Sequence, residues 1–137
     1  MATYPDIIEA PYEYQSLLGF EMVEWTETLV RIQAEMKPKL TNRYGLPHGG
    51  VHASLLDTAM GYCGCFTGDP DNKKFAMTLS MTVNYLSRPK GKMLIAEGVK
   101  TGGGRKVFFA EGKVFDETGE LIATGSGSFR YRTGSAG

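Results

Sequence analysis

The segment GLPHGGVHASLLDTAMGYCGCF, residues 45–66, holds residue types that can do chemistry. His48, Gly49 and Gly50 stand where an apolar run begins, and Asp57 lies near the middle of that run. At a helix start the backbone amides lack partners and carry partial positive charge, so unshielded glycine amides can bind a developing oxyanion. A loop-to-helix turn that needs glycine for its dihedral angles explains the same glycines equally well.

Asp57 is a carboxylate inside an apolar helix pattern. A buried carboxylate is costly unless it is paired or functional. A solvent-facing position, or a bond to Ser54 or Thr58, would give Asp57 a purely structural role. Its neighbours leave little polar face, which favours a functional role; they are Leu55, Leu56, Ala59 and Met60.

The spacing of Gly49 and Asp57 has a geometric consequence. Eight residues of helix separate them by roughly 12 Å along the axis. The carboxylate of one chain is therefore too far from its own helix start to act on a carbonyl held there. If both groups serve one site, two chains supply them, as in a two-fold dimer with antiparallel helices.

Asn42 and two histidines flank this start. Asn42 can hold a carbonyl oxygen or a water, although a turn residue within Thr41 to Pro47 is the simpler interpretation. His48 can cap the helix, donate to a leaving group or act as a base. His48 and His52 are four residues apart, which suits metal binding, but no zinc-protease Glu follows and no third ligand is evident, so we expect no metal.

A glycine run, Gly102 to Gly104, precedes Arg105 and Lys106. It looks faintly like a phosphate loop, but the Gly-Lys-Ser/Thr ending is missing and a strand rather than a helix follows. We expect a turn there, with the two basic side chains as surface charges that could touch phosphates.

The elements that must position these residues follow from hydrophobic periodicity. The length of 137 residues predicts one domain, with a helical segment at residues 1–19 and a disordered tail at 133–137. We expect helices at 11–18 and 48–66 and strands at 20–25, 30–36, 77–85, 92–100, 106–116 and 121–132. Sequential strands with short turns indicate an antiparallel sheet wrapped around the long helix, an α+β fold. Gly61 and Gly64 are expected to let the sheet approach that helix.

Composition excludes some functions and locations. Fifteen basic and fifteen acidic residues cancel, and no basic patch shows, so nucleic acid is not expected as a partner. No run approaches the roughly 20 apolar residues of a membrane span, and we expect no signal peptide. Cys63 and Cys65 point about 200° apart on a helix and do not bridge easily, which favours a reducing, cytoplasmic location.

The spacing Asn42-x-x-Gly45-x-x-His48-Gly49-Gly50, followed by Asp57 and Gly61, resembles hotdog-fold acyl-CoA thioesterases. It is most similar to the phenylacetate-pathway (PaaI-like) branch of the 4-hydroxybenzoyl-CoA thioesterase superfamily. The resemblance runs from about Phe20 to Tyr131 and includes Thr78 to Leu86, GGGRKVFFAEGKV and LIATGSGSF. It implies a long helix wrapped by a curved antiparallel sheet, and two chains paired into one continuous sheet.

The resemblance also implies a role for each residue. The Gly49 amide would polarise the thioester carbonyl, with Asn42 and His48 beside the thioester. Asp57 of the partner would act as general base on water or as nucleophile. Thr78 would help hold the water, at a position where many relatives carry Ser. The expected substrate-binding residues are Gly50 and, for the phosphates of coenzyme A, Arg88, Arg105 and Lys106.

The activity implied is hydrolysis of acyl-CoA without a cofactor, by a homodimer or a dimer of dimers. An acyl-thioester hydratase or dehydratase and a non-catalytic acyl-CoA-binding module are the alternatives. The sequence leaves the acyl group open. Tyr62, Phe66 and Tyr85 either line an aromatic-acyl pocket or, as we favour, fill the core.

Overall fold

A computed structural model describes residues 7–133. Residues 134–137 of the tail expected at 133–137, and residues 1–6 of the helical segment expected at 1–19, lie outside the described residues. The elements are α1 (Glu13–Leu18), β1 (Glu21–Trp25), β2 (Val30–Glu35), the 3-10 turn η2 (Pro38–Leu40), α2 (Gly49–Cys63), β3 (Ala76–Tyr85), β4 (Met93–Gly103), β5 (Val107–Asp116) and β6 (Leu121–Tyr131). Within residues 7–133 no helix is long and apolar enough to cross a membrane.

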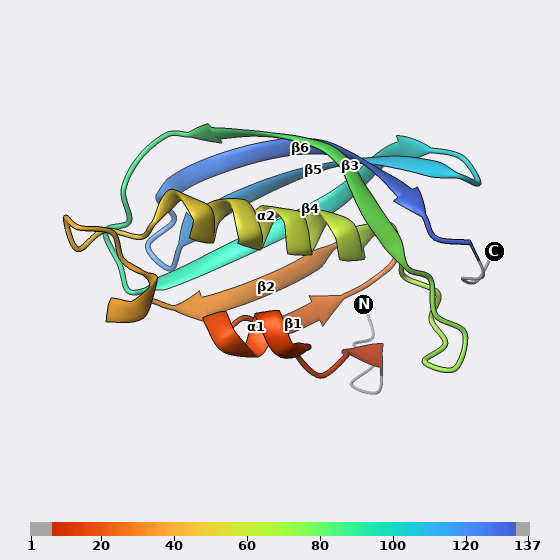
Figure 1. Cartoon of the computed structure of the whole chain (residues 1–137), viewed down its shortest axis with the longest axis horizontal. Helices are drawn as coiled ribbons and strands as arrows, with labels where there is room; N and C mark the ends of the chain where they lie inside the picture. The colour runs from red at the N-terminus through yellow and green to blue at the C-terminus, as the bar shows by residue number, and fades with distance from the viewer. Residues whose placement is uncertain (1–6, 134–137) are drawn as a thin grey trace.

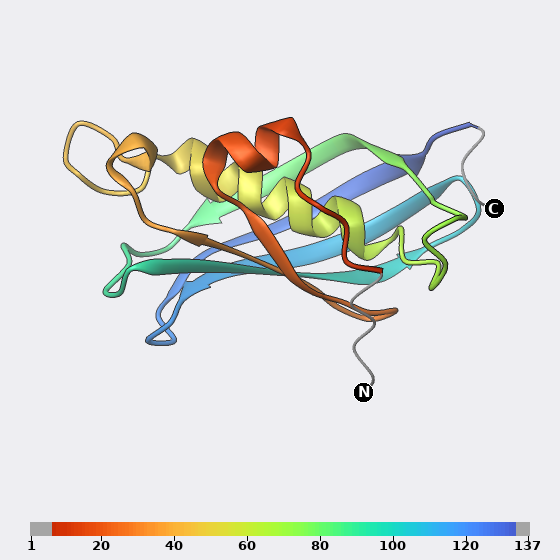
Figure 2. The same cartoon turned by 90° about the horizontal axis from the view of Figure 1, so that it is seen from below.

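All six strands form one antiparallel sheet in the order β1-β2-β4-β5-β6-β3. The sheet curves around α2, and α1 lies on the same side of the sheet as α2 (Figures 1 and 2). The expected α+β architecture, with a long helix wrapped by a curved antiparallel sheet, is confirmed. β1 and β3 are the two edges, so β3 has a strand neighbour on one side only.

Two expected boundaries were wrong. The long helix ends at Cys63 rather than Phe66, because the amides of Gly64 and Cys65 both turn back to the carbonyl of Tyr62. β4 continues through Gly102 and Gly103, which pair with Phe109 and Phe108 of β5 and were expected in the turn. The turn itself is shorter and begins at Gly104, whose amide donates to the carbonyl of Val107 at 2.8 Å.

A row of three glycines crosses the sheet beneath α2. Gly98 of β4 pairs with Gly112 of β5, which pairs with Gly125 of β6. A β-carbon on Gly98 would lie 2.6 Å from the carbonyl oxygen of Ala59, and one on Gly112 would lie 3.0 Å from a methyl of Leu56. The helix backbone therefore rests directly on the sheet at this row.

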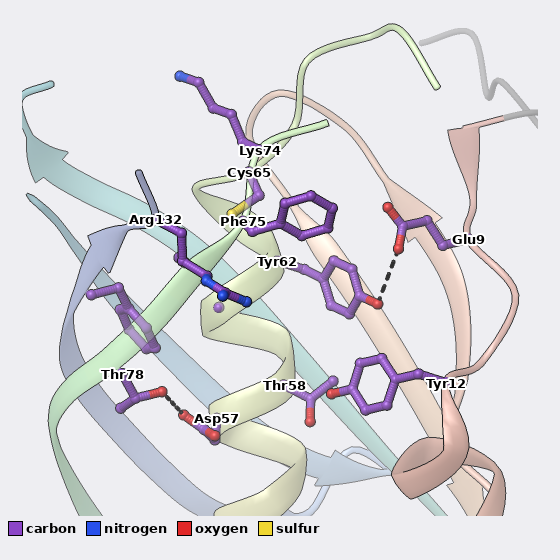
Figure 3. A pocket seen from close by; sticks show the side chains of 13 residues that line it. Glu9, Tyr12, Asp57, Thr58, Tyr62, Cys65, Lys74, Phe75, Thr78 and Arg132 are labelled. Carbon is purple, nitrogen blue, oxygen red and sulfur yellow. Dashed lines mark hydrogen bonds between the residues drawn. The ribbon is translucent and has the colours of Figure 1, made fainter. Parts of the chain in front are cut away.

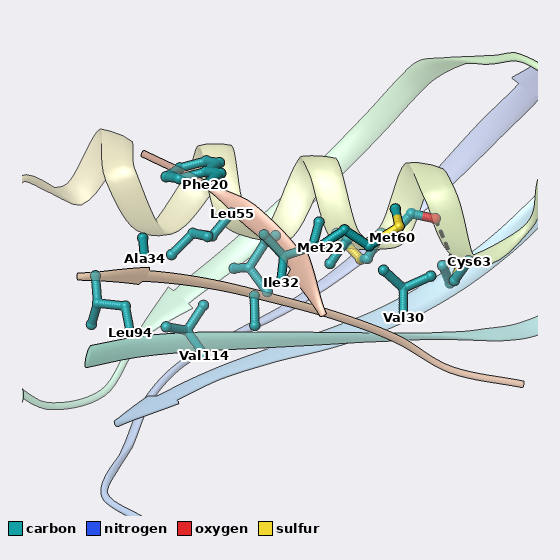
Figure 4. Close-up of a cluster of buried hydrophobic side chains, with 14 of the residues drawn as sticks. Phe20, Met22, Val30, Ile32, Ala34, Leu55, Met60, Cys63, Leu94 and Val114 are labelled. Carbon is teal, nitrogen blue, oxygen red and sulfur yellow. Dashed lines mark hydrogen bonds between the residues drawn. The ribbon is translucent and has the colours of Figure 1, made fainter. Parts of the chain in front are cut away.

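The core fills the space between α2 and the sheet (Figure 4). Leu55, Leu56 and Met60 of the helix are fully buried, and Phe108 stacks on Phe129 with ring centroids 5.1 Å apart. Apolar side chains from α2 and from strands on both sides of the glycine row thus hold the helix in place by burial.

The two helix glycines differ in their surroundings. Glycine lowers helix stability by about 1 kcal/mol relative to alanine. A β-carbon on Gly64 would collide with the ring of Phe108 at 2.4 Å, so close packing explains Gly64 as expected. For Gly61 that expectation was wrong, because the nearest atom to its β-carbon would be on Phe129 at 3.9 Å.

Asp116, 1% exposed, joins two loops at the end of the sheet where α2 begins. Its carboxylate accepts hydrogen bonds from the hydroxyl and amide of Thr118, in its own turn. It also accepts from the amides of Lys90 and Gly91, in the loop between β3 and β4. These bonds, the Thr118 hydroxyl first, hold the pKa of Asp116 well below its usual range.

We expect the Asp116 carboxylate to make the free energy of unfolding depend on pH. An Asp has a pKa of about 3.9 when unfolded. Because the folded pKa is lower, the stabilisation is present above pH 4 and is lost as pH falls below it. The free energy of unfolding of the wild type, measured with urea, should fall as pH drops below about 4, and Asp116→Asn should flatten that slope. An equally steep slope in Asp116→Asn would show that other carboxylates cause it.

Candidate active site

The start of α2 offers one open backbone donor. His48 is the N-cap residue, and its Nδ1 accepts a hydrogen bond from the Gly50 amide at 2.8 Å. The Gly50 amide, expected to be open, is therefore occupied. Among the described residues nothing accepts a hydrogen bond from the Gly49 amide. A neutral His48 with Nδ1 as acceptor carries its hydrogen on Nε2, so the imidazole is itself a donor.

Tyr85, at the end of β3, covers this helix start. Its hydroxyl donates to the Gly49 carbonyl at 2.9 Å, and its ring would lie 3.4 Å from a β-carbon on Gly49. It is 57% exposed, so it does not fill the core. Its place at the helix start was not predicted from the sequence. The only signal for it was its place as the last residue of the alternating strand.

His52 belongs to the packing around Tyr85. Its ring lies 6.1 Å from the Tyr85 ring and is buried, which lowers the pKa of His52 and keeps it neutral. Its Nδ1 has no hydrogen-bond partner within residues 7–133. In the same range, no group of three His, Cys, Asp or Glu side chains is arranged to hold a metal ion.

Asp57 and Thr78 form the second half of the site. The Thr78 hydroxyl donates to Oδ1 of Asp57 at 2.6 Å, joining β3 to the middle of α2 (Figure 3). Both residues line a pocket of about 260 Å³ that runs along α2 toward Cys65. Asp57 is half-buried, and no described residue donates to its Oδ2. One carboxylate oxygen is therefore fixed by Thr78, and the other is available to a ligand.

Asn42 shapes the loop that leads into α2. Its side-chain oxygen accepts from the amides of Tyr44 at 2.9 Å and Leu46 at 3.2 Å. The turn interpretation therefore holds for this oxygen. The side-chain NH₂ group is the part of Asn42 that remains for a substrate.

The three expected phosphate-binding cations are exposed, and one chain does not bring them together. Arg88 follows β3 at the end of the sheet where α2 begins. Arg105 and Lys106 lie in the turn after β4, a strand of 11 residues that spans about 35 Å. Arg88 is thus at one end of the sheet and the other two cations are at the opposite end.

Gly49 and Asp57 also stay apart within one chain, eight residues along an unbroken α2. This architecture, a long helix wrapped by a curved antiparallel sheet, is the hotdog fold. The profile of the thioesterase superfamily matches residues 44–123, which include Gly49, Asp57 and Thr78. The chain belongs to the thioesterase superfamily.

Solved structures agree with this assignment. A conserved protein from Pseudomonas aeruginosa superposes with a TM-score of 0.80 at 25% identity, covering 93% of this chain and 97% of that one. A Bacillus halodurans protein solved with CoA is 30% identical with a TM-score of 0.78, covering 89% and 80%. The E. coli PaaI protein from the phenylacetic acid degradation operon, at 17% identity, a TM-score of 0.78 and coverage of 90% and 87%, shows the same fold. A search of curated protein sequences finds no match.

Proposed function

We propose that this chain hydrolyses acyl-CoA thioesters to a free acid and coenzyme A, in a site shared by two copies of the chain. The observation that carries the proposal is the 2.6 Å hydrogen bond from Thr78 to Asp57 in the pocket wall. It orients a carboxylate toward a space large enough for an acyl group. The complex of a 30% identical protein with CoA supports the ligand class.

Asp57 and Thr78 can activate a water molecule together. Thr78 gives its one hydroxyl hydrogen to Oδ1 of Asp57, so toward a water it can only accept. Water would then donate one hydrogen to Thr78 and the other to Oδ2 of Asp57. As Oδ2 takes its proton, the water oxygen attacks the thioester carbon. Direct attack by Asp57 would instead give a mixed anhydride, and turnover in ¹⁸O-water would label Asp57 only on that path.

The helix start of the partner would stabilise the resulting oxyanion. The Gly49 amide, open and at the positive end of the α2 dipole, suits an oxygen on which negative charge develops. Collapse of the tetrahedral intermediate breaks the C–S bond, and the sulfur leaves with a proton from Asp57 or from Nε2 of His48. Cys63 and Cys65 take no part as nucleophiles, because burial raises their pKa values to about 12 and about 11.

The free edge of β3 is the surface we propose for pairing two chains. It is a 10-residue strand with one side unpaired, and long apolar edges of this kind favour strand addition. Apolar side chains about half-exposed gather on β3 and its flanks: Phe75, Met77, Leu79, Tyr85 and Leu86. Two β3 strands, antiparallel about a two-fold axis, would join the sheets and bring each helix start toward the other chain's Asp57.

Leu79→Glu is expected to convert the dimer into monomers and to lower hydrolysis. Leu79 is 53% exposed, and a two-fold axis would place two new carboxylates near each other. A sizing column with light scattering measures the mass. Leu17→Glu, at a 64% exposed position of α1, is the control. A Leu79→Glu protein that keeps the mass of the wild-type dimer would rule out this edge as the interface.

Release of free thiol from a panel of acyl-CoAs, in buffer containing a metal chelator, tests the activity. Hydrolysis frees one thiol per turnover, a hydratase frees none, and a binding module shows affinity without turnover. We expect thiol release that the chelator leaves unchanged. No release from any acyl-CoA, or activity that returns only with added zinc, would overturn the proposed chemistry.

A further inference from the structure

Gly61 occupies a position in α2 that neither backbone geometry nor packing explains. It is not among the residues with positive φ, and its β-carbon would meet no atom closer than Phe129 at 3.9 Å. A glycine in the last turn of α2 weakens the helix relative to alanine, without any gain from the sheet at this position. Gly61 lines a pocket together with Asp57. The methyl group of Gly61→Ala would therefore reduce the space in that pocket.

The helix periodicity places Gly61 on the route from the carboxylate to the far end of the pocket. Asp57 and Gly61 are four residues apart, so they lie on one face of α2, and Cys65 follows just beyond the helix end. All three line the pocket, which therefore extends from Asp57 past Gly61 to the end of α2. An acyl group whose carbonyl carbon is beside Asp57 would pass over Gly61 with its next atoms.

The side chain of Tyr62, which forms the pocket wall beside Gly61, is held in place by its neighbours. The Tyr62 ring stacks on Tyr12 with centroids 6.4 Å apart (Figure 3). It also meets the Trp25 ring edge-on, with centroids 5.2 Å apart. Trp25 also donates to the Tyr62 carbonyl at 3.1 Å, and the Tyr62 hydroxyl bonds to Glu9 at 3.4 Å. Because Tyr62 is fixed from several sides, this wall cannot easily retreat from a larger residue at Gly61.

We propose that Gly61 is the residue that sets which acyl groups reach Asp57. The absent side chain leaves room for acyl groups longer or wider than a few carbons, and any side chain there would close the pocket beyond the carbonyl. The pocket of about 260 Å³ is slightly smaller than the roughly 300–1,000 Å³ of typical small-molecule sites. It thus suits the acyl portion of an acyl-CoA rather than the whole molecule. This assignment rests on the proposed function.

The test compares Gly61→Ala and Gly61→Leu with the wild type on acetyl-CoA, octanoyl-CoA and phenylacetyl-CoA. A change of one methylene in an apolar pocket alters kcat/KM by about 10–200-fold. We expect roughly tenfold loss on the two larger substrates for Gly61→Ala and at least on the order of 100-fold for Gly61→Leu. Activity on acetyl-CoA should stay within about threefold. Gly61→Ala should also raise Tm by a few degrees, since alanine favours the helix.

Gly64→Ala is the matched control, because a β-carbon there collides with Phe108. It should lower Tm and reduce activity on all three substrates alike. Affinity for S-octyl-CoA, a thioether that cannot be hydrolysed, separates the two proposals. A wild type that releases no thiol but binds S-octyl-CoA more tightly than CoA, with that gain lost in Gly61→Leu, would overturn only the hydrolase assignment. Equal losses on all substrates in Gly61→Leu, or no loss on any, would overturn the role of Gly61.

Discussion

Asp57→Asn is expected to lower the rate of acyl-CoA hydrolysis by on the order of 100-fold to 10,000-fold, the usual contribution of a general base. The amide has the shape of the carboxylate, and its oxygen can still accept the hydroxyl of Thr78, so the local packing should persist. It cannot take a proton from water at neutral pH. Thiol-release kinetics measure the loss, and calorimetry with S-octyl-CoA should give a dissociation constant close to that of the wild type.

Asp71→Asn is the control for this substitution, because it removes the same charge from an exposed loop outside the pocket. It should leave turnover unchanged. An Asp57→Asn protein that retains more than about a tenth of wild-type turnover would make Asp57 a structural residue and remove the proposed base.

Mixed dimers of two inactive variants are expected to recover about a quarter of wild-type activity. Gly49→Pro removes the open amide, and Asp57→Ala removes the carboxylate, so each variant alone should be inactive. If the two variants are unfolded together and refolded, random pairing makes half of the dimers mixed. In each mixed dimer one site combines an intact helix start with an intact carboxylate, and the other site lacks both.

The structure favours Gly49→Pro as a clean removal of one donor. Gly49 is the first residue of α2, the position where proline is best tolerated in a helix. His48 before it is extended, with φ −62° and ψ 139°, which a following proline requires. The added β-carbon would meet the Tyr85 ring at 3.4 Å, an ordinary contact. Circular dichroism and a sizing column should confirm the fold first.

A double variant, with Gly49→Pro and Asp57→Ala in one chain, distinguishes shared sites from sites that are complete within one chain. Refolded in equal amount with the wild type, it should give about a quarter of full activity if sites are shared, since both sites of each mixed dimer are broken. If each chain carried a complete site, the same mixture would give about half. A correctly assembled mixture of the single variants that stays inactive would show that Gly49 and Asp57 do not meet across chains.

The helices and strands were predicted well from the sequence, because they depend on residues that are close together along the chain. The alternation of Val30 to Met36 and of Met77 to Tyr85 predicted strands, and the apolar run after His48 predicted the helix, because periodicity reports one buried face. The resemblance assigned both Asp57 and Thr78 to the attacking water, and the structure adds a 2.6 Å hydrogen bond between them, across 21 residues of sequence.

Other features could not be predicted because they depend on contacts across the sheet. The register that aligns Gly98 with Gly112 and Gly125 is not visible in any one strand. Gly61 was assigned to sheet packing together with Gly64 because both are glycines in the predicted helix, and only their surroundings in the fold distinguish the two. Tyr85 reaches Gly49 over 36 residues, a pairing that periodicity in β3 does not reveal.

The glycine row implies that substitutions in this chain can abolish activity in two unrelated ways, by removing a reacting group or by displacing the helix that carries it. A methyl group at Gly98 would push against the carbonyl of Ala59 and lift the helix segment that carries Asp57. Replacing Gly98 should therefore be tolerated as poorly as replacing the carboxylate itself, although Gly98 contacts no substrate. In a population of variants, selection that preserves the position of the helix would resemble selection that preserves catalysis. A residue such as Gly98 could therefore be invariant only because no larger side chain fits there.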